Sequence, residues 1–215
     1  MKVNTDGVLL GAWADVGYAK NILDIGTGTG VIALMMAQKN PAAQIDAIDI
    51  DHDAWLQATE NFDLYGTHRL KACHTSLQNF EPGIHYDAII SNPPYFIDDY
   101  KTESHQKNIA KHSIALSYAH LLSGIAKLLN DTGKAFIVLP AFNLAPFEKE
   151  AAPHLLYITV VTEVIAVEGK PPYLALLQLE RAAKDFSKTT ITIQDPGGNF
   201  TEQYKELTKD FYLKF

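Results

Sequence analysis

A short run of chemically distinctive residues, Ser91-Asn92-Pro93-Pro94-Tyr95, follows residues 86–90, which have the apolar pattern of a buried strand. The Asn side-chain oxygen and the backbone carbonyl after it can together accept both hydrogens of a planar amine, and a Tyr ring offers a face for stacking. Two consecutive prolines stiffen the loop and remove two amide donors. The run predicts chemistry on an amino group, although Asn and Pro are also ordinary turn residues.

A glycine-rich segment lies upstream, where residues 21–25 have the pattern of a strand that leads directly into Gly26-Thr27-Gly28-Thr29-Gly30. A helix pattern over residues 31–38 begins at once. Glycines at alternate positions let a ligand approach the backbone closely, and the free amides and dipole of a helix N-terminus favour a polar or anionic group. The segment is therefore a candidate cofactor loop.

The spacing of these glycines limits the kind of cofactor. It differs from the G-x-G-x-x-G pattern that holds a dinucleotide pyrophosphate, and no Lys-Ser/Thr pair follows to hold a triphosphate. Residues 44–50 have the pattern of the next strand, and Asp49 lies about 20 residues beyond the loop, where an acidic side chain can bind ribose hydroxyls. A nucleoside cofactor without phosphates fits this arrangement.

The series Asp24-Ile25-Gly26-Thr27-Gly28-Thr29-Gly30, then Asp49, then Asn92-Pro93-Pro94-Tyr95 resembles class I S-adenosylmethionine-dependent methyltransferases in its motifs and their order. The resemblance implies S-adenosyl-L-methionine as the cofactor and direct methyl transfer to a planar nitrogen. Three acceptors remain open: the exocyclic amine of adenine in RNA, the same amine in DNA, and a glutamine side-chain amide. The implied catalytic residues are Asn92, Pro93, Pro94 and Tyr95.

Residues 1–13 and 209–215 narrow the choice, because they resemble the bacterial methyltransferases that act on the adenine beside the anticodon of a valine tRNA. This resemblance implies methylation of the adenine N6 amine, with the tRNA anticodon loop as partner and no stable protein partner. Asn4 and Lys111 depart from the family pattern, which usually has Gly and Arg there. Relatives also carry an aromatic and basic lead-in, so residues upstream of Met1, where the gene encodes them, are expected to raise tRNA affinity.

Several cofactor contacts follow from the resemblance. Asp24 binds the amino-acid end of the cofactor, caps the glycine turn, or does both, while Thr5 and Asp6 either border the methyl-donor pocket or only begin a helix. The predicted cofactor-binding residues are Thr5, Asp6, Asp24, Gly26, Thr27, Gly28, Gly30, Asp49, Ile50, Ser76, Leu77 and Asn92.

Composition favours a cytoplasmic protein without a membrane span. No run of roughly eighteen apolar residues occurs and no charged-then-apolar leader opens the chain, while Cys73 is the only cysteine. No histidine pair has metal-ligand spacing with a clear third ligand, so we expect no metal. The net charge of -7 and the presence of only two arginines, Arg69 and Arg181, predict weak tRNA affinity, although most lysines follow Tyr95.

Strand and helix patterns alternate along the chain without internal repeats, which favours a doubly wound α/β sheet. We expect a Rossmann-like methyltransferase sheet, mostly parallel, with an antiparallel C-terminal edge hairpin, in a single domain over residues 1–215. Expected helices cover residues 5–15, 31–38, 53–64, 117–129 (stopped near Gly133) and 143–152; expected strands cover residues 21–25, 44–50, 69–74, 86–90, 134–139, 156–167 and 173–181.

Residues 96–116 have weak periodicity and many polar side chains, so they are either a substrate lid or a solvated mobile loop without a ligand role. Among rival functions, glutamine methylation of a release factor ranks second, because those enzymes normally carry a helical domain in front. DNA methylation ranks lower, since no segment is long enough for a target-recognition domain. A cofactor-binding module without catalysis is disfavoured by the intact Asn-Pro-Pro-Tyr run.

Overall fold

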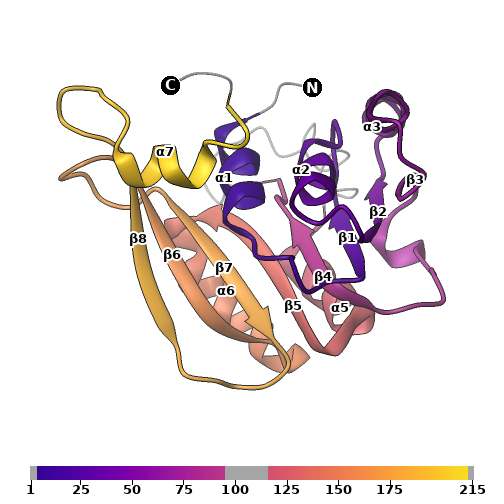
Figure 1. Cartoon of the computed structure of the whole chain (residues 1–215). Coiled ribbons are helices and arrows are strands. Elements are labelled where there is room, and N and C mark those ends of the chain that lie inside the picture. Colours follow the sequence, from indigo (N-terminus) through magenta and orange to yellow (C-terminus); the bar gives the residue numbers. More distant parts are fainter. Residues whose placement is uncertain (1–3, 95–115, 213–215) are drawn as a thin grey trace, which may run out of the picture.

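The computed structural model describes residues 4–94 and 116–212 of the chain. An eight-stranded sheet with the order β3-β2-β1-β4-β5-β7-β6-β8 runs through the molecule (Figure 1). Its strands are β1 (Asn21–Ile25), β2 (Gln44–Asp49), β3 (Leu70–His74), β4 (Tyr86–Ser91), β5 (Leu129–Pro140), β6 (Tyr157–Val167), β7 (Leu174–Glu180) and β8 (Ser187–Gln194).

Strands β1 to β5 pair with one another in parallel, so their carboxyl ends lie at the same end of the sheet, here called its carboxyl edge. The register pairs Ile25 with Ser91 and Asp49 with His74. Strand β7 is antiparallel to both β5 and β6. This topology confirms the predicted doubly wound, mostly parallel α/β sheet, and places the glycine loop and the Asn-Pro-Pro run at the same edge.

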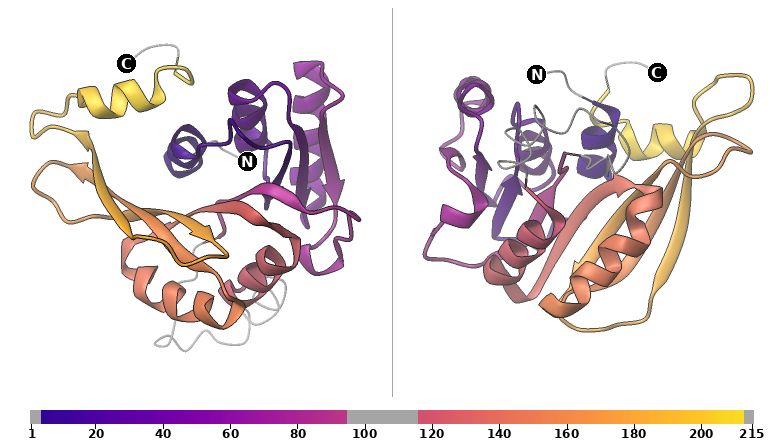
Figure 2. Two further views of the ribbon diagram at one scale, coloured as in Figure 1. Left: turned by 60° about the horizontal axis from the view of Figure 1, so that its bottom comes forward. Right: turned by 180° about the vertical axis from the view of Figure 1, so that it is seen from behind.

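Helices cover both faces of the sheet, with α5 and α6 on one face and α1, α2, α3 and α7 on the other (Figure 2). The α-helices are α1 (Thr5–Trp13), α2 (Val31–Lys39), α3 (His52–Tyr65), α5 (Tyr118–Leu128), α6 (Leu144–Ala151) and α7 (Glu202–Thr208). The short 3₁₀ helices are η1 (Leu77–Asn79), η2 (Ala141–Asn143) and η3 (Ala152–His154).

Each face of the sheet has its own apolar cluster, and β4 contributes to both. Ala88 and Ile90 pack on the side of α1 and α2, whereas Ile89 packs on the side of α5. Successive side chains of a strand point to opposite faces, so a strand buried on both faces is apolar throughout. This burial fixes β4, and with it the position of Asn92 directly after the strand.

The predicted hairpin of β6 and β7 is antiparallel as expected, but it is not the edge of the sheet. Strand β8 pairs parallel to β6 on the outside and forms that edge, and α7 follows it. Of the residues in β8, only Ile191 and Ile193 are buried. A half-buried strand of this kind carries a weak apolar signal, and the sequence-based prediction missed it.

Gly133 does not end a helix, although the sequence pattern predicted that the helix over residues 117–129 stops near it. Helix α5 ends at Leu128, and Gly133 lies within β5. A Cβ atom at Gly133 would lie 3.0 Å from the backbone oxygen of Tyr86 and 3.1 Å from that of Asp87. Glycine therefore lets β5 approach β4 closely.

Some predictions concern residues outside the described part of the chain. Tyr95 lies there, as does nearly all of the proposed lid, residues 96–115. Within the described residues, no helix is long and apolar enough to cross a membrane, and no group of His, Cys, Asp and Glu side chains is placed to hold a metal ion. The assignment of a single domain to residues 1–215 stays a prediction.

Candidate active site

A cavity of about 520 Å³ lies at the carboxyl ends of β1, β2 and β4, where open α/β sheets bind their ligands. Its volume is within the usual range for small-molecule sites, roughly 300–1,000 Å³. Ten predicted site residues line it: Gly26, Thr27, Gly28, Asp49, Ile50, Ser76, Leu77, Asn92, Pro93 and Pro94. The cavity thus brings together the glycine loop, the acidic residue after β2 and the loop after β4.

The glycine loop is held in place by its neighbours in the sheet. The backbone N–H groups of Gly26 and Thr27 both donate to the Ile48 carbonyl oxygen, at 2.9 and 3.0 Å. Gly26 has a φ of 70°, and a Cβ atom there would meet no atom within 4 Å. The backbone at Gly26 therefore borders open space and can be approached closely by a ligand.

Gly30, by contrast, serves packing. It is the N-cap of α2 with a φ of 80°, and a Cβ atom there would lie 2.5 Å from the Phe62 ring. Gly30 is not among the residues that line the cavity. Its close contact with α3 accounts for the third glycine of the motif.

Asp49 ties the glycine loop to β2 through its carboxylate. Oδ2 accepts a hydrogen bond from the Gly28 N–H at 2.8 Å, and Oδ1 accepts one from the Asp51 N–H at 2.9 Å. A carboxylate offers roughly four acceptor sites, so acceptor capacity remains on both oxygens. Asp49 can therefore hold the loop and a ribose hydroxyl at the same time.

Asp24 lies beneath the glycine loop and does not line the cavity. Its side chain is fully buried; Oδ2 accepts a hydrogen bond from the Thr27 hydroxyl at 2.6 Å, while Oδ1 has no hydrogen-bond partner among the described residues. Burial raises the pKa of Asp24 to about 7, against the opposing effect of the Thr27 bond. In this structure Asp24 supports the turn, the second of its two predicted roles.

The Asn-Pro-Pro run begins where β4 meets β1. The Ser91 hydroxyl donates to the Ile25 carbonyl oxygen at 2.9 Å, which ties the two strand ends together. Asn92 follows, and its Nδ2 donates to Oδ1 of Asn4 at 3.4 Å. Asn92, Pro93 and Pro94 all line the cavity.

The start of α1 borders the cavity, but not through the residues that were predicted. Thr5 and Asp6 do not line it, whereas Asn4 and Gly7 do. Most of the remaining lining residues flank the predicted motifs and belong to strand ends or helix starts. The lining residues outside the predicted set are Asn4, Gly7, Ile25, Thr29, Val31, Ile32, Ile48, Thr75, Gln78 and Ser91; Leu116, the last residue of the proposed lid, lines the cavity as well.

The sheet order and the position of the cavity define a Rossmann-like α/β protein, and comparisons with known proteins show that it is a methyltransferase. Residues 7–146 match the methyltransferase small domain family. A predicted O-methyltransferase from Agrobacterium tumefaciens has the same fold, with a TM-score of 0.72 at 13% identity over 95% of this chain and 96% of that one.

Two relatives specify the group further. The tRNA1(Val) (adenine(37)-N6)-methyltransferase of Pedobacter heparinus is 40% identical, and that of Parabacteroides distasonis is 41% identical. Each alignment covers 100% of this chain and 92% of the relative. The chain therefore belongs to this family of methyltransferases, which confirms the predicted family.

The methyl donor of the family is S-adenosyl-L-methionine, and the cavity fits it. Asp49 offers acceptors for hydroxyl groups, and the glycine loop leaves open space beside its backbone. Ile48, Ile50 and Leu77 also line the cavity and supply apolar surface suited to a flat base. The cavity thus offers both polar and apolar groups to the nucleoside cofactor expected from the sequence.

Proposed function

We propose that this protein transfers a methyl group from S-adenosyl-L-methionine to the exocyclic N6 amine of adenine 37 in a tRNA1(Val). The names of its relatives support this substrate. The observation that carries the proposal is the position of Asn92, an amide directly after β4 on the wall of the cavity that also contains Asp49. The methyl donor and the acceptor amine would therefore meet in the same cavity.

The donor side of the site is formed by the glycine loop and Asp49. In the proposal, Asp49 accepts hydrogen bonds from the ribose hydroxyls, and Ile50 and Leu77 enclose the adenine ring. Thr27 and Gly28 turn the backbone beside the amino-acid end. When bound, S-adenosyl-L-methionine supplies a methyl group activated by a positively charged sulfur.

The acceptor side is formed by Asn92 and Pro93. An adenine amine is a weak nucleophile because its lone pair is delocalised into the ring, so holding it in place and favouring a pyramidal nitrogen lowers the barrier. The Asn92 side-chain oxygen and the Pro93 carbonyl would accept its two hydrogens. Tyr95, outside the described residues, would stack on the base, a contact worth about 1–3 kcal/mol in single-stranded recognition.

The charge of the chain bears on how the tRNA is held. With a net charge of -7 and only two arginines, the chain must rely mainly on lysines for phosphate contacts. A base beside the anticodon is already partly unpaired, so its extrusion requires less free energy than opening a duplex. We therefore expect weak tRNA affinity that rests largely on contacts with the extruded base.

The test is incubation of the purified protein with labelled S-adenosyl-L-methionine and a tRNA1(Val) transcript, followed by digestion to nucleosides. Label should appear in N6-methyladenosine and be absent from a matched transcript with guanine at position 37. A peptide release factor incubated in parallel should stay unlabelled. Label on the release factor, or equal labelling of the two transcripts, would reject the proposal.

A further inference from the structure

One oxygen atom of Asn4 connects the first helix to the proposed acceptor loop. Asn4 is the N-cap of α1, and its Oδ1 accepts the backbone N–H of Gly7 at 2.9 Å. The same Oδ1 accepts Nδ2 of Asn92 at 3.4 Å. The two asparagines are 88 residues apart in the sequence, so this contact exists only in the folded chain.

These bonds determine which way each amide faces. A side-chain amide has an oxygen and a nitrogen branch of nearly equal shape, so hydrogen bonds decide between its two orientations. The Gly7 N–H can only donate, so Asn4 must present its oxygen there. Asn92 must then present its NH₂ group to that oxygen, which leaves the Asn92 Oδ1 branch free of this contact.

Helix α1 is fixed firmly enough to act as a reference for this orientation. At its C-terminal end, Nζ of Lys39 donates to the carbonyl oxygens of Gly11 at 3.2 Å and of Ala12 at 2.7 Å. Gly11 also packs directly on α2, because a Cβ atom there would lie 2.6 Å from the Met35 sulfur. The position of Asn4 is therefore set by the packing of α1 on α2.

Gly7 leaves the space that the contact needs. A Cβ atom at Gly7 would lie 3.0 Å from Oδ1 of Asn4 and 3.5 Å from Nδ2 of Asn92. A side chain at this position would crowd the Asn4 oxygen and come into contact with the Asn92 amide. Glycine thus keeps the first turn of α1 open on the side of the acceptor loop.

We infer that Asn4 is a positioning residue for methyl transfer: its side-chain oxygen holds the Asn92 amide so that the Asn92 oxygen is presented to the acceptor amine. The inference rests on the proposed function, in which Asn92 contacts the amine. Without Asn4, the Asn92 amide would rotate among orientations, and only some of them would offer an acceptor.

The test is a set of three substitutions that separate helix capping from positioning. Asn4→Ser keeps an N-cap oxygen for Gly7 but is one bond shorter, so it loses reach to Asn92. Asn4→Asp keeps both the cap and the reach, and Asn4→Ala removes both. Measurements are the single-turnover methylation rate on tRNA1(Val), the dissociation constant for S-adenosyl-L-methionine and the melting temperature.

We expect Asn4→Ser to slow single turnover about three- to tenfold, the effect of one neutral hydrogen bond, with unchanged cofactor affinity and melting temperature. Asn4→Asp should stay near the wild-type rate. Asn4→Ala should match Asn4→Ser in rate while melting at a lower temperature. A wild-type rate for Asn4→Ser, or an equal loss for Asn4→Asp, would overturn the inference.

A second readout separates this inference from the proposed function. The side-chain amide NMR signals of Asn92, assigned by their loss in Asn92→Ala, report the contact without any substrate. These signals should shift in Asn4→Ser, and they should shift by the same amount in Asn4→Ala, because both variants lose the contact. In Asn4→Asp they should keep the position of a hydrogen-bonded amide. If the wild-type protein methylates no tRNA but these signals behave as expected, only the proposed function fails; if they are the same in Asn4→Ser as in wild type, the positioning role fails.

Discussion

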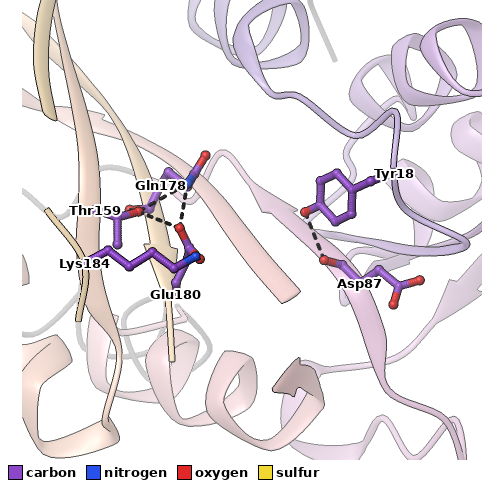
Figure 3. Close-up of polar contacts among 6 residues, drawn as sticks. All are labelled: Tyr18, Asp87, Thr159, Gln178, Glu180 and Lys184. Carbon is purple, nitrogen blue, oxygen red and sulfur yellow. Dashed lines mark hydrogen bonds and ion pairs between the residues drawn. The ribbon is translucent and has the colours of Figure 1, made fainter. Parts of the chain in front are cut away.

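The sheet has a carboxyl edge, where the parallel strands end, and an opposite edge, where they begin. These two edges use polar residues in different ways. At the carboxyl edge, Asp49 and Asn92 line the cavity and keep acceptor capacity beyond the bonds they make within the chain. At the opposite edge, Tyr18, Asp87 and Glu180 contact other protein groups (Figure 3). Polar side chains are present at both edges, so their presence alone does not identify a site.

The opposite edge is rich in bonds made within the chain. Asp87 Oδ2 accepts the backbone N–H groups of Lys20 and Asn21 at 2.8 and 3.0 Å, and Oδ1 accepts Nδ2 of Asn130 at 2.6 Å. The Tyr18 hydroxyl donates to the Asp87 carbonyl oxygen at 3.1 Å. These bonds join the starts of β1, β4 and β5, so Asp87 serves the fold.

Glu180 is a buried member of the same edge. It accepts hydrogen bonds from Thr159 at 3.1 Å and from Gln178 at 3.0 Å, and it pairs with Lys184 (Figure 3). Burial acts to raise the pKa of Glu180, but the bonds from Lys184 and Thr159 outweigh it and leave the pKa below its usual range. Asp49 differs in that it lines the cavity and keeps acceptor capacity beyond its bonds within the chain, which is the property expected of a binding residue.

The strongest test of the contrast between the two edges is the substitution Asn92→Ala. We expect single turnover on tRNA to fall about 10²- to 10³-fold, the usual effect of removing one group that stabilises the transition state. Cofactor affinity should stay close to wild type, because the glycine loop and Asp49 are untouched. Rapid-quench kinetics and calorimetry measure the two quantities, and near-normal turnover would remove Asn92 from the catalytic role.

The next effect is expected for Asp49→Ala, which should weaken S-adenosyl-L-methionine binding about tenfold to a hundredfold, as expected for the loss of hydrogen bonds to a charged group. The matched control is Asp51→Ala. Asp51 caps α3 by accepting the Ala54 N–H at 2.9 Å and does not line the cavity. Calorimetry should show normal affinity in the control. If both variants lost affinity equally, the effect would come from the fold of the segment between β2 and α3 and not from the Asp49 carboxylate.

At the opposite edge, Glu180→Ala should lower the free energy of unfolding by about 1–3 kcal/mol, because Thr159 and Gln178 lose a buried acceptor. Cofactor affinity should not change. Urea denaturation and calorimetry measure the two effects. A variant that binds cofactor weakly while remaining fully folded would show that the two edges are not independent.

The smallest effect concerns Asp24, whose folded-state pKa of about 7 lies far above its unfolded value near 4. Between these values the folded state binds more protons than the unfolded state, so the free energy of unfolding falls as pH rises. From pH 6 to 7 this contribution is about 1 kcal/mol, and Asp24→Asn should remove it. Urea denaturation of both proteins at the two pH values tests this, and equal pH slopes would contradict it.

The core of the site was predictable because its signals are local. The strand before the glycine loop, Asp49 at the end of β2 and Asn92 after β4 are each defined by a few adjacent residues, and parallel strands bring their carboxyl ends together. Strand β8 was missed because it buries little apolar surface. Asn4 and Gly7 were missed because the position of α1 depends on contacts with α2, including the Lys39 bonds, that connect residues far apart in the sequence.

The packing of α7 has a consequence for synthesis of the protein. Tyr204 of α7 is buried in the same cluster as Val8 and Leu9 of α1, and Leu207 and Tyr212 pack against it. Among the described helices, α1 leaves the ribosome first and α7 last. The part of the α1 surface that α7 covers therefore stays exposed until this last helix has emerged, whereas the surface of α1 that faces α2 can be buried early in translation.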